Sequence, residues 1–499
     1  MVKAGIFWAV PNGAGGQSAL EFSKSFTESE ADANGFINYP YSHYEVWDDE
    51  VKGLGNDCYK FPRGRILYDT KTNKHRIFAD ECVSEETVDE LVNFYGIKEF
   101  ELCRDEHYTC PRCAARRRRE ERTLSCNILR GKDKIGENLI EISYGGTTVL
   151  VELGRALDGG GNALEKEILK RDYAAVVVSH YHEDHAGLIE YKRDCPVYLG
   201  HGARKIVLAM LEYRKKVLPE NLKSYQSGRP FKVGGIKITP YLCDHSAFDS
   251  YMLLFEAGGK SVLYTGDFRF HGRKGSERLL AALPKSVDVL IHEGTNRGKN
   301  ACTMSETELE NQAVSVMRAT DMPVFVVQSG TNIDRLVSIY RASKRSGRLF
   351  YMDNYVSLIA SAAGGSIPRP DVFRGVVAFT PVPLQGRRKD LFLEIKNKRG
   401  IKGIAGGTKR FTMLVRPSML GYLKKLFAAA GIEKATLIYS LWNGYKERED
   451  MAKFLHGMAE LGAEEVDLHT SGHASEEDIE LLKKTVNAKE TVCVHTEGK

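Results

Sequence analysis

The sequence predicts an α/β protein from residue 137 to the C-terminus, preceded by a smaller segment of mixed helix and strand. Strand and helix patterns alternate there, beginning with the strand pair "NLIEISYGGTTVLVELG", the short helix "ALEKEILKR" and the buried strand "AAVVVS". This alternation is typical of sheets covered by helices. The chain has 499 residues, enough for several domains with cores of their own.

The first part of the chain differs in composition and is predicted to be a separate domain, residues 1–127, of unknown role. It is acidic over residues 1–50 and rich in Tyr and Trp. Residues 64–80 alternate around a polar turn, which predicts a β-hairpin. Residues 84–97 open with Ser84 and place apolar side chains at helical spacing, which predicts a capped helix.

Bulk composition indicates a soluble protein of the cytoplasm. Hydrophobic residues make up 42% and charged residues 27% of the chain, as in ordinary globular proteins. The ten cysteines form no closely spaced framework, so we expect reduced thiols. The apolar run Ala4 to Val10 is too short for a secretory signal, and no later run approaches a membrane span. We therefore expect no membrane partner.

Positive charge is concentrated in one window. Residues 386–410 hold nine Lys and Arg against two acids. Two interpretations stay open: a solvated face, or a surface that contacts a phosphate backbone.

The strongest chemical signal is "SHYHEDH", residues 179–185, directly after a buried strand. His180 and His182 lie two apart on an extended segment and share one face, and Asp184 and His185 follow at the turn. Imidazole and carboxylate ligands at this density suit a divalent cation, zinc first and manganese second. The segment therefore predicts a metal site.

The pattern His-x-His-x-Asp-His resembles the metallo-β-lactamase fold. The resemblance implies an αββα sandwich with two divalent ions at one edge, one bound by His180 and His182 and the other by Asp184 and His185. Two further ligands of the family match His245 in "YLCDHSAFDS" and Asp267 in "SVLYTGDFRF", with Asp267 expected to bridge both ions. Such a pair would activate one water for attack on a phosphoryl group. The strand before the signature carries Glu152 where the family usually has Asp, which leaves the role of Glu152 open.

A long interruption separates Asp267 from the last ligand. The next suitable histidine, His495 in "VCVHTEGK", lies 228 residues later. This resembles the β-CASP subfamily of nucleic-acid-cutting members, and ribonuclease J most closely. The resemblance implies a metallo-β-lactamase core at 128–305 and 446–499, an inserted β-CASP α/β domain at 306–445, and an N-terminal α+β extension.

The remaining residues of the subfamily pattern can be carried over one by one. The acid at a strand end matches Glu293, and the Ser-Gly-His turn matches Ser471, Gly472 and His473. The resemblance implies that His473, paired with Glu293, acts as an acid or touches the phosphate, and that Asp184 is required for catalysis. Ser471 and Gly472 would offer a hydroxyl and a backbone N–H to a phosphate.

Further candidate RNA contacts lie in and around the inserted domain. "VFVVQSGTNIDRL" carries Asn332 and Arg335 in the subfamily's recurring places, and we assign both to substrate binding. Arg269 and Arg273 are predicted either to touch the scissile strand or to form surface pairs. Three aromatic residues are candidates for stacking on bases, although aromatic side chains near apolar strands are more often core: Tyr351, Tyr355 and Phe392.

A second metal site is open in the N-terminal part. Cys110-x-x-Cys113 is half of a zinc knuckle. Cys103 and His107 are the candidates for its second half, but they lie too close for a standard ribbon, and Cys126 is single. A structural zinc within 103–126 and unligated cysteines both stay open.

The resulting hypothesis is a two-metal ribonuclease that hydrolyses single-stranded RNA as a 5′→3′ exonuclease, an endonuclease or both. Three alternatives remain: a single-stranded DNA nuclease of the same subfamily, a small-molecule ester or thioester hydrolase on the same scaffold, and a non-catalytic RNA-binding subunit. The oligomeric state stays open, and a homo-oligomer is one of the possibilities.

Overall fold

The protein divides into two compact units, Met1–Arg122 and Thr123–Lys499. The structure is a computed structural model that describes residues 2–11, 17–26, 36–37, 64–69, 74–79, 85, 88–89, 92–93, 96–104, 122–156, 163–299, 304–382, 384 and 386–497.

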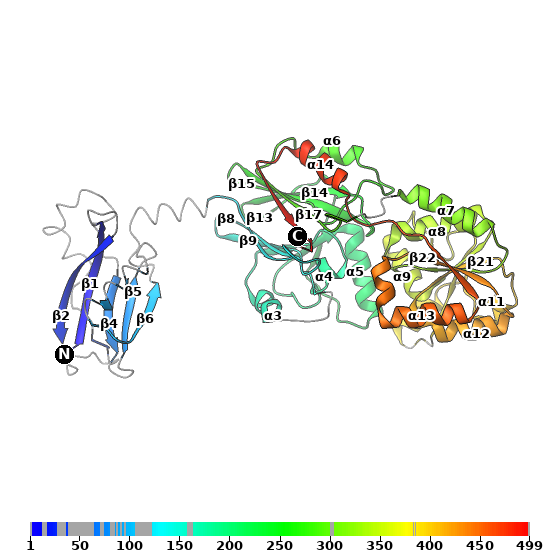
Figure 1. Ribbon diagram of the computed structural model, residues 1–499, viewed down its shortest axis with the longest axis horizontal. Coiled ribbons are helices and arrows are strands. Elements are labelled where there is room, and N and C mark those ends of the chain that lie inside the picture. The colour runs from blue at the N-terminus through cyan, green and yellow to red at the C-terminus, as the bar shows by residue number, and fades with distance from the viewer. Residues whose placement is uncertain are drawn as a thin grey trace. The chain divides into compact units, whose positions relative to one another are not determined.

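The first unit is built on a six-stranded sheet in the order β2-β1-β4-β5-β6, with β3 paired to β4 (Figure 1). Its strands are β1 (Val2–Pro11), β2 (Gln17–Phe26), β3 (Phe36–Ile37), β4 (Gly64–Asp69), β5 (Lys74–Ala79) and β6 (Phe100–Arg104). The predicted hairpin is confirmed, because β4 and β5 pair antiparallel from Gly64↔Ala79 to Asp69↔Lys74. Residues 85, 88–89 and 92–93 are helical, in agreement with the predicted helix.

The second unit contains an αββα sandwich of two six-stranded sheets. The first sheet, in the order β12-β11-β10-β9-β8-β7, comprises β7 (Ser125–Arg130), β8 (Leu139–Tyr144), β9 (Thr147–Val151), β10 (Ala175–Val177), β11 (Val197–Gly200) and β12 (Leu222–Tyr225). The second, in the order β13-β14-β15-β16-β17-β24, comprises β13 (Phe231–Val233), β14 (Ile236–Cys243), β15 (Ser250–Ala257), β16 (Lys260–Tyr264), β17 (Val289–Glu293) and β24 (Glu490–Val494).

Apolar side chains from both sheets meet between them. Val177 of β10 and Phe255 of β15, each fully buried, belong to one core cluster. The outer faces are covered by helices: α3 (Ala163–Lys170), α4 (Glu183–Ala186) and α5 (His201–Tyr213) accompany the first sheet, and α6 (Glu277–Ala282) and α14 (Glu476–Val486) the second. The predicted fold class is thereby confirmed.

A third six-stranded sheet interrupts the sandwich between β17 and β24. All of its strands are parallel, in the order β20-β19-β21-β18-β22-β23. They are β18 (Val324–Val327), β19 (Leu349–Asp353), β20 (Val376–Phe379), β21 (Phe411–Val415), β22 (Ala435–Tyr439) and β23 (Ala463–Asp467). The accompanying helices are α7 (Glu306–Arg318), α8 (Ile333–Arg345), α9 (Asn354–Ala363), α10 (Arg387–Leu393), α11 (Ile401–Ala405), α12 (Leu420–Ala430) and α13 (Glu449–Glu460), with 3₁₀ turns η4 (Pro417–Met419) and η5 (Asn443–Glu447).

This inserted sheet extends to Asp467, beyond residue 445, where the sequence predicted its end. The difference arises because β23 pairs in parallel with β22 from Ala435↔Ala463 to Tyr439↔Asp467. The chain then returns to the sandwich through α14 and β24, and β24 pairs with β17. This return brings the far end of the sequence beside the strand that carries Glu293.

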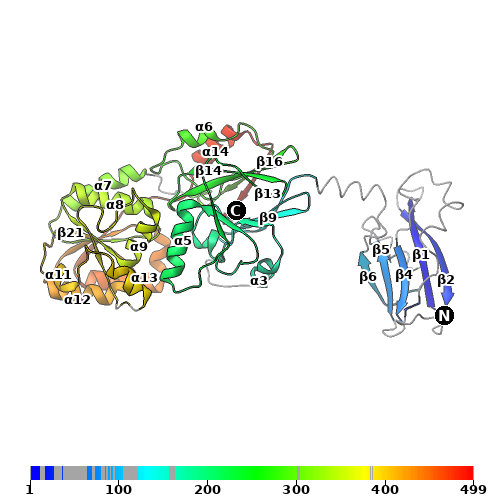
Figure 2. The same cartoon turned by 180° about the vertical axis from the view of Figure 1, so that it is seen from behind.

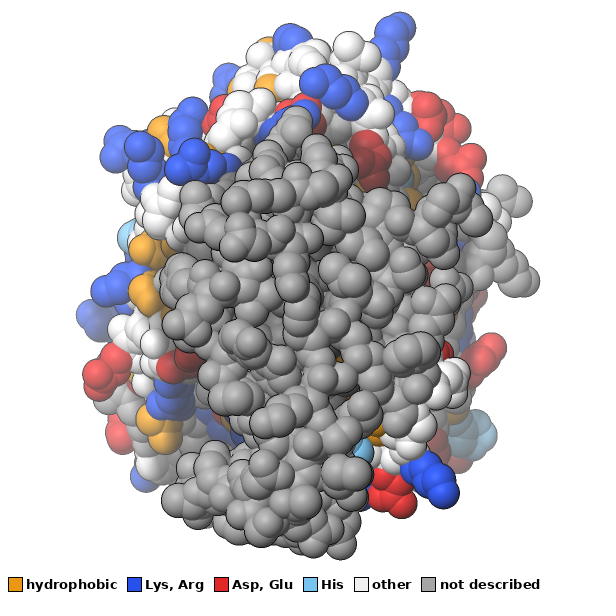
Figure 3. Space-filling model, turned by 90° about the vertical axis from the view of Figure 1, so that its left-hand side faces the viewer, with side chains coloured by type: hydrophobic (Ala, Val, Ile, Leu, Met, Phe, Trp, Pro, Cys, Tyr) orange, Lys and Arg blue, Asp and Glu red, His pale blue; other side chains and the backbone are white. Residues whose placement is uncertain are grey.

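Sandwich and inserted sheet pack directly on each other within the second unit. Helices α5 and α9 lie side by side (Figures 1 and 2) and make tertiary contacts, and their apolar residues share one core cluster. On the face drawn in Figure 3, the visible described residues carry Lys and Arg (blue) beside Asp and Glu (red), with apolar side chains in small groups. None of the described helices has the length and hydropathy needed to cross a bilayer.

Candidate metal centre

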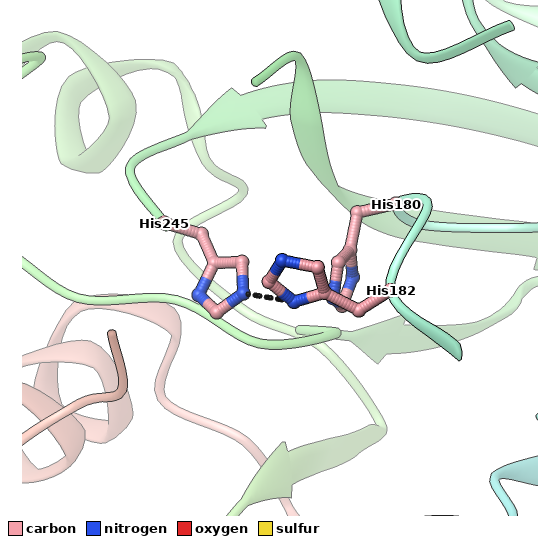
Figure 4. A group of neighbouring side chains, drawn as sticks. All are labelled: His180, His182 and His245. Atoms are coloured by element: carbon pink, nitrogen blue, oxygen red, sulfur yellow. Dashed lines mark hydrogen bonds between the residues drawn. The ribbon is translucent and has the colours of Figure 1, made fainter. Parts of the chain in front are cut away.

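Three histidines gather where the two sandwich sheets end. His180 follows β10, His182 precedes α4, and His245 follows β14. One ring nitrogen from each lies within 4.8 Å of the others, and the three side chains point toward one another (Figure 4). His245 Nε2 stands 3.1 Å from His182 Nδ1. Three imidazoles converging in this way could bind one divalent cation.

A second group lies beside the first and contains both acids of the predicted set. Asp184, His185, Asp267 and His495 place ligand atoms within 4.8 Å of one another. His495 Nε2 is 3.0 Å from Asp184 Oδ2, and His185 Nε2 is 3.2 Å from Asp267 Oδ2. Asp267 Oδ2 also lies 3.7 Å from His180 Nε2, so its carboxylate stands between the two groups. The structure thus brings all seven predicted metal ligands to one place.

Backbone and side-chain partners orient these rings. His245 donates from Nδ1 to the Gly472 carbonyl at 2.6 Å, which leaves its Nε2 lone pair toward the group. Glu152 accepts from the Ser179 amide at 3.1 Å, and its other carboxylate oxygen lies 3.3 Å from His185 Nδ1. Glu152 therefore reaches a ligand ring despite its extra methylene.

Among the described residues, several buried ligand atoms of the centre have no hydrogen-bond partner. They include His180 Nε2, His185 Nδ1 and both carboxylate oxygens of Asp267. Unpaired buried polar atoms are costly and uncommon, so the donor set fits a bound cation. Burial, reinforced by neighbouring imidazoles, holds the pKa values of His180 and His245 well below the usual range. Both are neutral at pH 7, the form in which imidazole binds a metal.

Asp267 is charged in spite of its burial. Burial alone would raise its pKa, but the nearby His185, His495 and His473 hold the pKa of this carboxyl well below its ordinary range. An ionised carboxylate buried among imidazoles is suited to bridging two cations.

Glu293 and His473 form a pair at the rim of this centre. His473 Nδ1 lies 2.9 Å from Glu293 Oε2 and 3.6 Å from Asp267 Oδ2. The other oxygen of Glu293 accepts from the Phe268 amide at 2.8 Å. Burial opposes protonation of His473, but the charges of Glu293 and Asp267 outweigh it and raise the pKa of His473 to about 9. The ring is 24% exposed, so it can meet a substrate.

The Ser-Gly-His turn is held by its neighbours. Ser471 Oγ accepts from Asn296 Nδ2 at 3.0 Å and from the His473 amide at 3.2 Å. Asn296 also donates to the carbonyls of His473 and Ala474. Ser471 and Gly472 are half-buried, and their contact with a phosphate stays a prediction.

Arg335 does not fit its predicted role in substrate binding. Its side chain is fully buried and donates to Glu306 at 3.2 Å, to the Thr470 carbonyl at 3.2 Å and to Ser440. The guanidinium of Arg335 donates to residues inside the protein, because helix α8 lies where the inserted sheet meets the sandwich. Asn332 caps this helix by accepting from the Arg335 amide at 2.9 Å, and its contact with substrate stays a prediction.

Arg269 and Arg273 are internal as well. Arg269 is fully buried and donates to Asp244 and Asp334, each at 2.9 Å, and to Glu306. Arg273 donates to Glu310 at 2.8 Å and to Ser338. Neither predicted role, a contact with the scissile strand or a surface pair, is met by Arg269.

Four of the nine cations in the basic window are engaged within the chain. Arg399 donates to the Tyr351 hydroxyl, Lys398 to the Leu393 carbonyl, Lys409 to the Gly431 carbonyl and Arg410 to Asp321. Of the predicted stacking residues, Tyr351 is core, while Tyr355 and Phe392 are half-buried.

The N-terminal zinc hypothesis falls largely outside the described residues. Cys103 lies on β6, and only its backbone is described. His107, Cys110 and Cys113 lie in the part of the chain that the structure leaves undescribed, so this site stays a prediction.

Three polar residues at the centre carried no signal in the sequence. Asn138 donates to His185 Nε2 at 3.2 Å, Thr295 Oγ1 lies 2.8 Å from His495 Nδ1, and Asn296 holds the Ser-Gly-His turn. Their partners are 47 to 200 residues away along the chain. No local pattern could have identified them.

Known proteins resemble this chain in sequence. Residues 162–327 match the β-lactamase superfamily domain. Ribonuclease J of Mycobacterium tuberculosis is 26% identical over 249 residues, which cover 45% of this chain and 43% of the relative. Ribonuclease J 1 of Streptococcus pyogenes is 21% identical over 74% of the chain and 67% of the relative, and ribonuclease J2 of Bacillus subtilis is 22% identical over 74% and 68%. The first of these matches spans less than half of the relative's length.

A solved structure extends the likeness in three dimensions. The crystal structure of a protein of unknown function from Enterococcus faecalis V583 superposes with a TM-score of 0.61 at 18% identity, covering 75% of this chain and 94% of that one. The sandwich of this protein thus has the metallo-β-lactamase fold, and over much of its length the chain resembles ribonuclease J.

Proposed function

We propose that this chain is a ribonuclease that hydrolyses phosphodiester bonds of single-stranded RNA with two divalent ions, zinc or manganese. The observation that supports it best is the 3.0 Å contact between His495 and Asp184, residues more than three hundred positions apart in the sequence. A centre assembled from both ends of an interrupted sandwich matches the predicted nuclease pattern, and the curated relatives named above are ribonucleases.

The predicted ligands would form two neighbouring metal sites. His180, His182 and His245 would hold one ion, and Asp184, His185 and His495 the other, with Asp267 between them. Bound there, the two ions would supply an activated water and neutralise charge on the attacked phosphoryl group.

His473 would act on the phosphate or on the leaving oxygen. Glu293 holds its Nδ1 at 2.9 Å, so the proton of the opposite nitrogen is free to face a substrate. A positioned acid of this kind typically contributes about 10²–10⁴-fold to a hydrolysis rate. Ser471 and Gly472, next to His473, would contact the same phosphate.

The inserted sheet would form one wall of the substrate cleft. This is supported at strand β22, whose end is linked by the bonds from Arg335 to Ser440 and Thr470 to the segment before the Ser-Gly-His turn. The 5′→3′ exonuclease and endonuclease modes are both compatible with such a cleft.

One assay tests the proposal. RNA and DNA oligonucleotides of one sequence, 5′-labelled and carrying monophosphate or triphosphate ends, are incubated with the full chain, with and without Mn²⁺ or Zn²⁺. We expect metal-dependent cutting of RNA that a chelator abolishes. Faster cutting of DNA would move the protein to the DNA-processing branch, and turnover of simple esters with intact RNA would overturn the proposal.

A further inference from the structure

The loop after β22 leaves two large aromatic side chains uncovered. Trp442 is 58% exposed and Tyr445 is 39% exposed. Burial of an aromatic ring is among the most favourable steps in folding, so a Trp left in water at a loop tip calls for a reason. Both lie at the 3₁₀ turn η5, beyond the carboxyl end of a parallel strand, where open α/β sheets bind their ligands.

The two rings are held in a defined arrangement. Their centroids are 5.4 Å apart at an interplanar angle of 89°. The Tyr445 amide donates to the Trp442 carbonyl at 3.0 Å, which closes the turn. A Cβ on Gly444 would come within 2.3 Å of the indole, so the ring rests directly on the glycine backbone. An indole fixed by its own turn loses little freedom on binding.

An exposed cation stands beside this pair. The Arg448 guanidinium lies 5.8 Å from the Tyr445 ring centroid. Its side chain is 65% exposed and lies 3.6 Å from the carboxylate of Asp450, which is exposed as well, and such a surface pair is weak. The neighbouring Lys446 is instead engaged by Glu465 and Asp467. Aromatic faces next to one open Arg suit a base followed by its phosphate.

The loop begins at a strand end that is bonded to the segment leading into the Ser-Gly-His turn. Ser440, at the end of β22, donates to the Leu468 carbonyl at 2.5 Å, and Arg335 bridges Ser440 to Thr470. Thr470 directly precedes the Ser-Gly-His turn.

We propose that Trp442 and Tyr445 form a stacking platform for a base of the single-stranded substrate, with Arg448 on the adjoining phosphate. The inference rests on the proposed function and adds to it the place where the strand lies outside the reacting phosphate. Every base has a π face, so the platform would favour single strands over duplexes without selecting sequence.

The test uses the full chain and a 2′-O-methyl RNA strand that resists hydrolysis. Fluorescence anisotropy of the labelled strand gives the affinity for wild type, W442A, W442F and Y191A. We expect W442A to bind about 10-fold more weakly, because loss of one base stack has that effect, and W442F to stay within about 3-fold. Tyr191 is the matched control: it is 51% exposed with Arg155 5.7 Å from its ring, and Y191A should bind like wild type. Thermal unfolding of each variant checks that it is folded.

Two further readouts separate the platform from the proposed activity. Trp442 is the only tryptophan after residue 47, so stacking should quench fluorescence in wild type and spare W442F, and a duplex should quench neither. The platform is wrong if W442A binds the single strand as tightly as wild type while wild type still cuts RNA. If wild type neither binds nor cuts RNA, the proposed function and the platform fall together. Equal loss of affinity for duplex, or loss of binding only to a protein partner, would also overturn it.

Discussion

Asp267 and Arg269 are two residues apart and equally buried, yet their surroundings are opposite. Among the described residues, neither carboxylate oxygen of Asp267 has a hydrogen-bond partner, although imidazole nitrogens surround it, the nearest being His185 Nε2 at 3.2 Å. The Arg269 guanidinium donates to Asp244, Asp334, Glu306 and the Ser471 carbonyl. A buried polar group without a partner costs stability, and one with partners on every side holds its elements together. The atoms around Asp267 are therefore available to a ligand. The network of Arg269 and its acidic partners instead holds neighbouring elements together, and we call this network the frame.

The frame joins the inserted sheet to the sandwich. Glu306, at the start of α7, accepts from Arg269, Arg335 and Ser338. The two arginines in turn hold the carbonyls of Ser471 and Thr470. His473 thus occupies its place beside Glu293 partly through a network that never touches it.

The largest expected effect is at the unpaired carboxylate. Asp267→Asn removes the charge shared by both metal groups, so RNA hydrolysis should fall by at least ~10³-fold, since several kcal/mol of charge stabilisation are lost. Metal content by plasma mass spectrometry and cutting of labelled RNA check this together. Unchanged metal content in this variant would break the contrast drawn between Asp267 and Arg269.

His473→Gln separates catalysis from metal binding. The variant keeps all seven predicted ligands, so its metal content should equal that of wild type while RNA cutting falls by about 10²–10⁴-fold. His469, four residues earlier in the sequence, is a half-buried histidine outside both ligand groups, so His469→Gln is the matched control and should keep its activity. Loss of metal from His473→Gln would instead make His473 a ligand.

Glu306→Gln tests the frame. It leaves Arg269 and Arg335 buried without their shared counter-charge, and the free energy of unfolding should fall by about 3–5 kcal/mol. Urea unfolding of the metal-free protein measures this without interference from the metal. A change below about 1 kcal/mol would show that the network contributes little.

Glu306 also predicts how the free energy of unfolding changes at acid pH. Burial opposes the charge of Glu306, but Arg335 and Arg269 outweigh it and lower its pKa from 4.5 to about 2. A depressed folded-state pKa gives stability that is present above pH 4.5 and is lost as the pH falls toward 2. Unfolding free energy measured between pH 6 and 3 should therefore fall less steeply in Glu306→Gln than in wild type. Parallel curves would contradict the assignment.

The smallest effect concerns Glu152, which orients a ligand without being one. Glu152→Gln removes the carboxylate facing His185 Nδ1, and metal affinity should weaken about 10- to 100-fold. A competition titration with a chromophoric chelator measures it. Glu152→Asp, the residue typical of the family, should bind at least as well as the Gln variant, and a reversed order would assign Glu152 another role.

The metal ligands could be predicted from the sequence, whereas the partners of Arg269 could not. His180, His182, Asp184 and His185 lie within one short segment, so their spacing alone predicts convergence. The partners of Arg269 are 25, 37 and 65 residues away in the chain, and such pairings depend on the fold. Arg269 and Arg335 were therefore predicted to contact substrate or, for Arg269, to form a surface pair, whereas the structure buries both side chains.

The end of the inserted sheet was missed for a related reason. Strand β23 reads "AEEVD" and is buried only at Ala463, so it lacks the apolar run that marks a central strand. It is an edge strand, recognised by its pairing with β22 and not by its composition.

We propose that the ligand atoms gathered around Asp267 hold two catalytic cations. The most direct measurement is the metal content of the full chain during stepwise loading of a metal-free sample with Zn²⁺ or Mn²⁺, with RNA cutting followed at each step. We predict about two ions per chain, with activity rising as the second is bound. Full RNA cutting at a metal content near zero would contradict it.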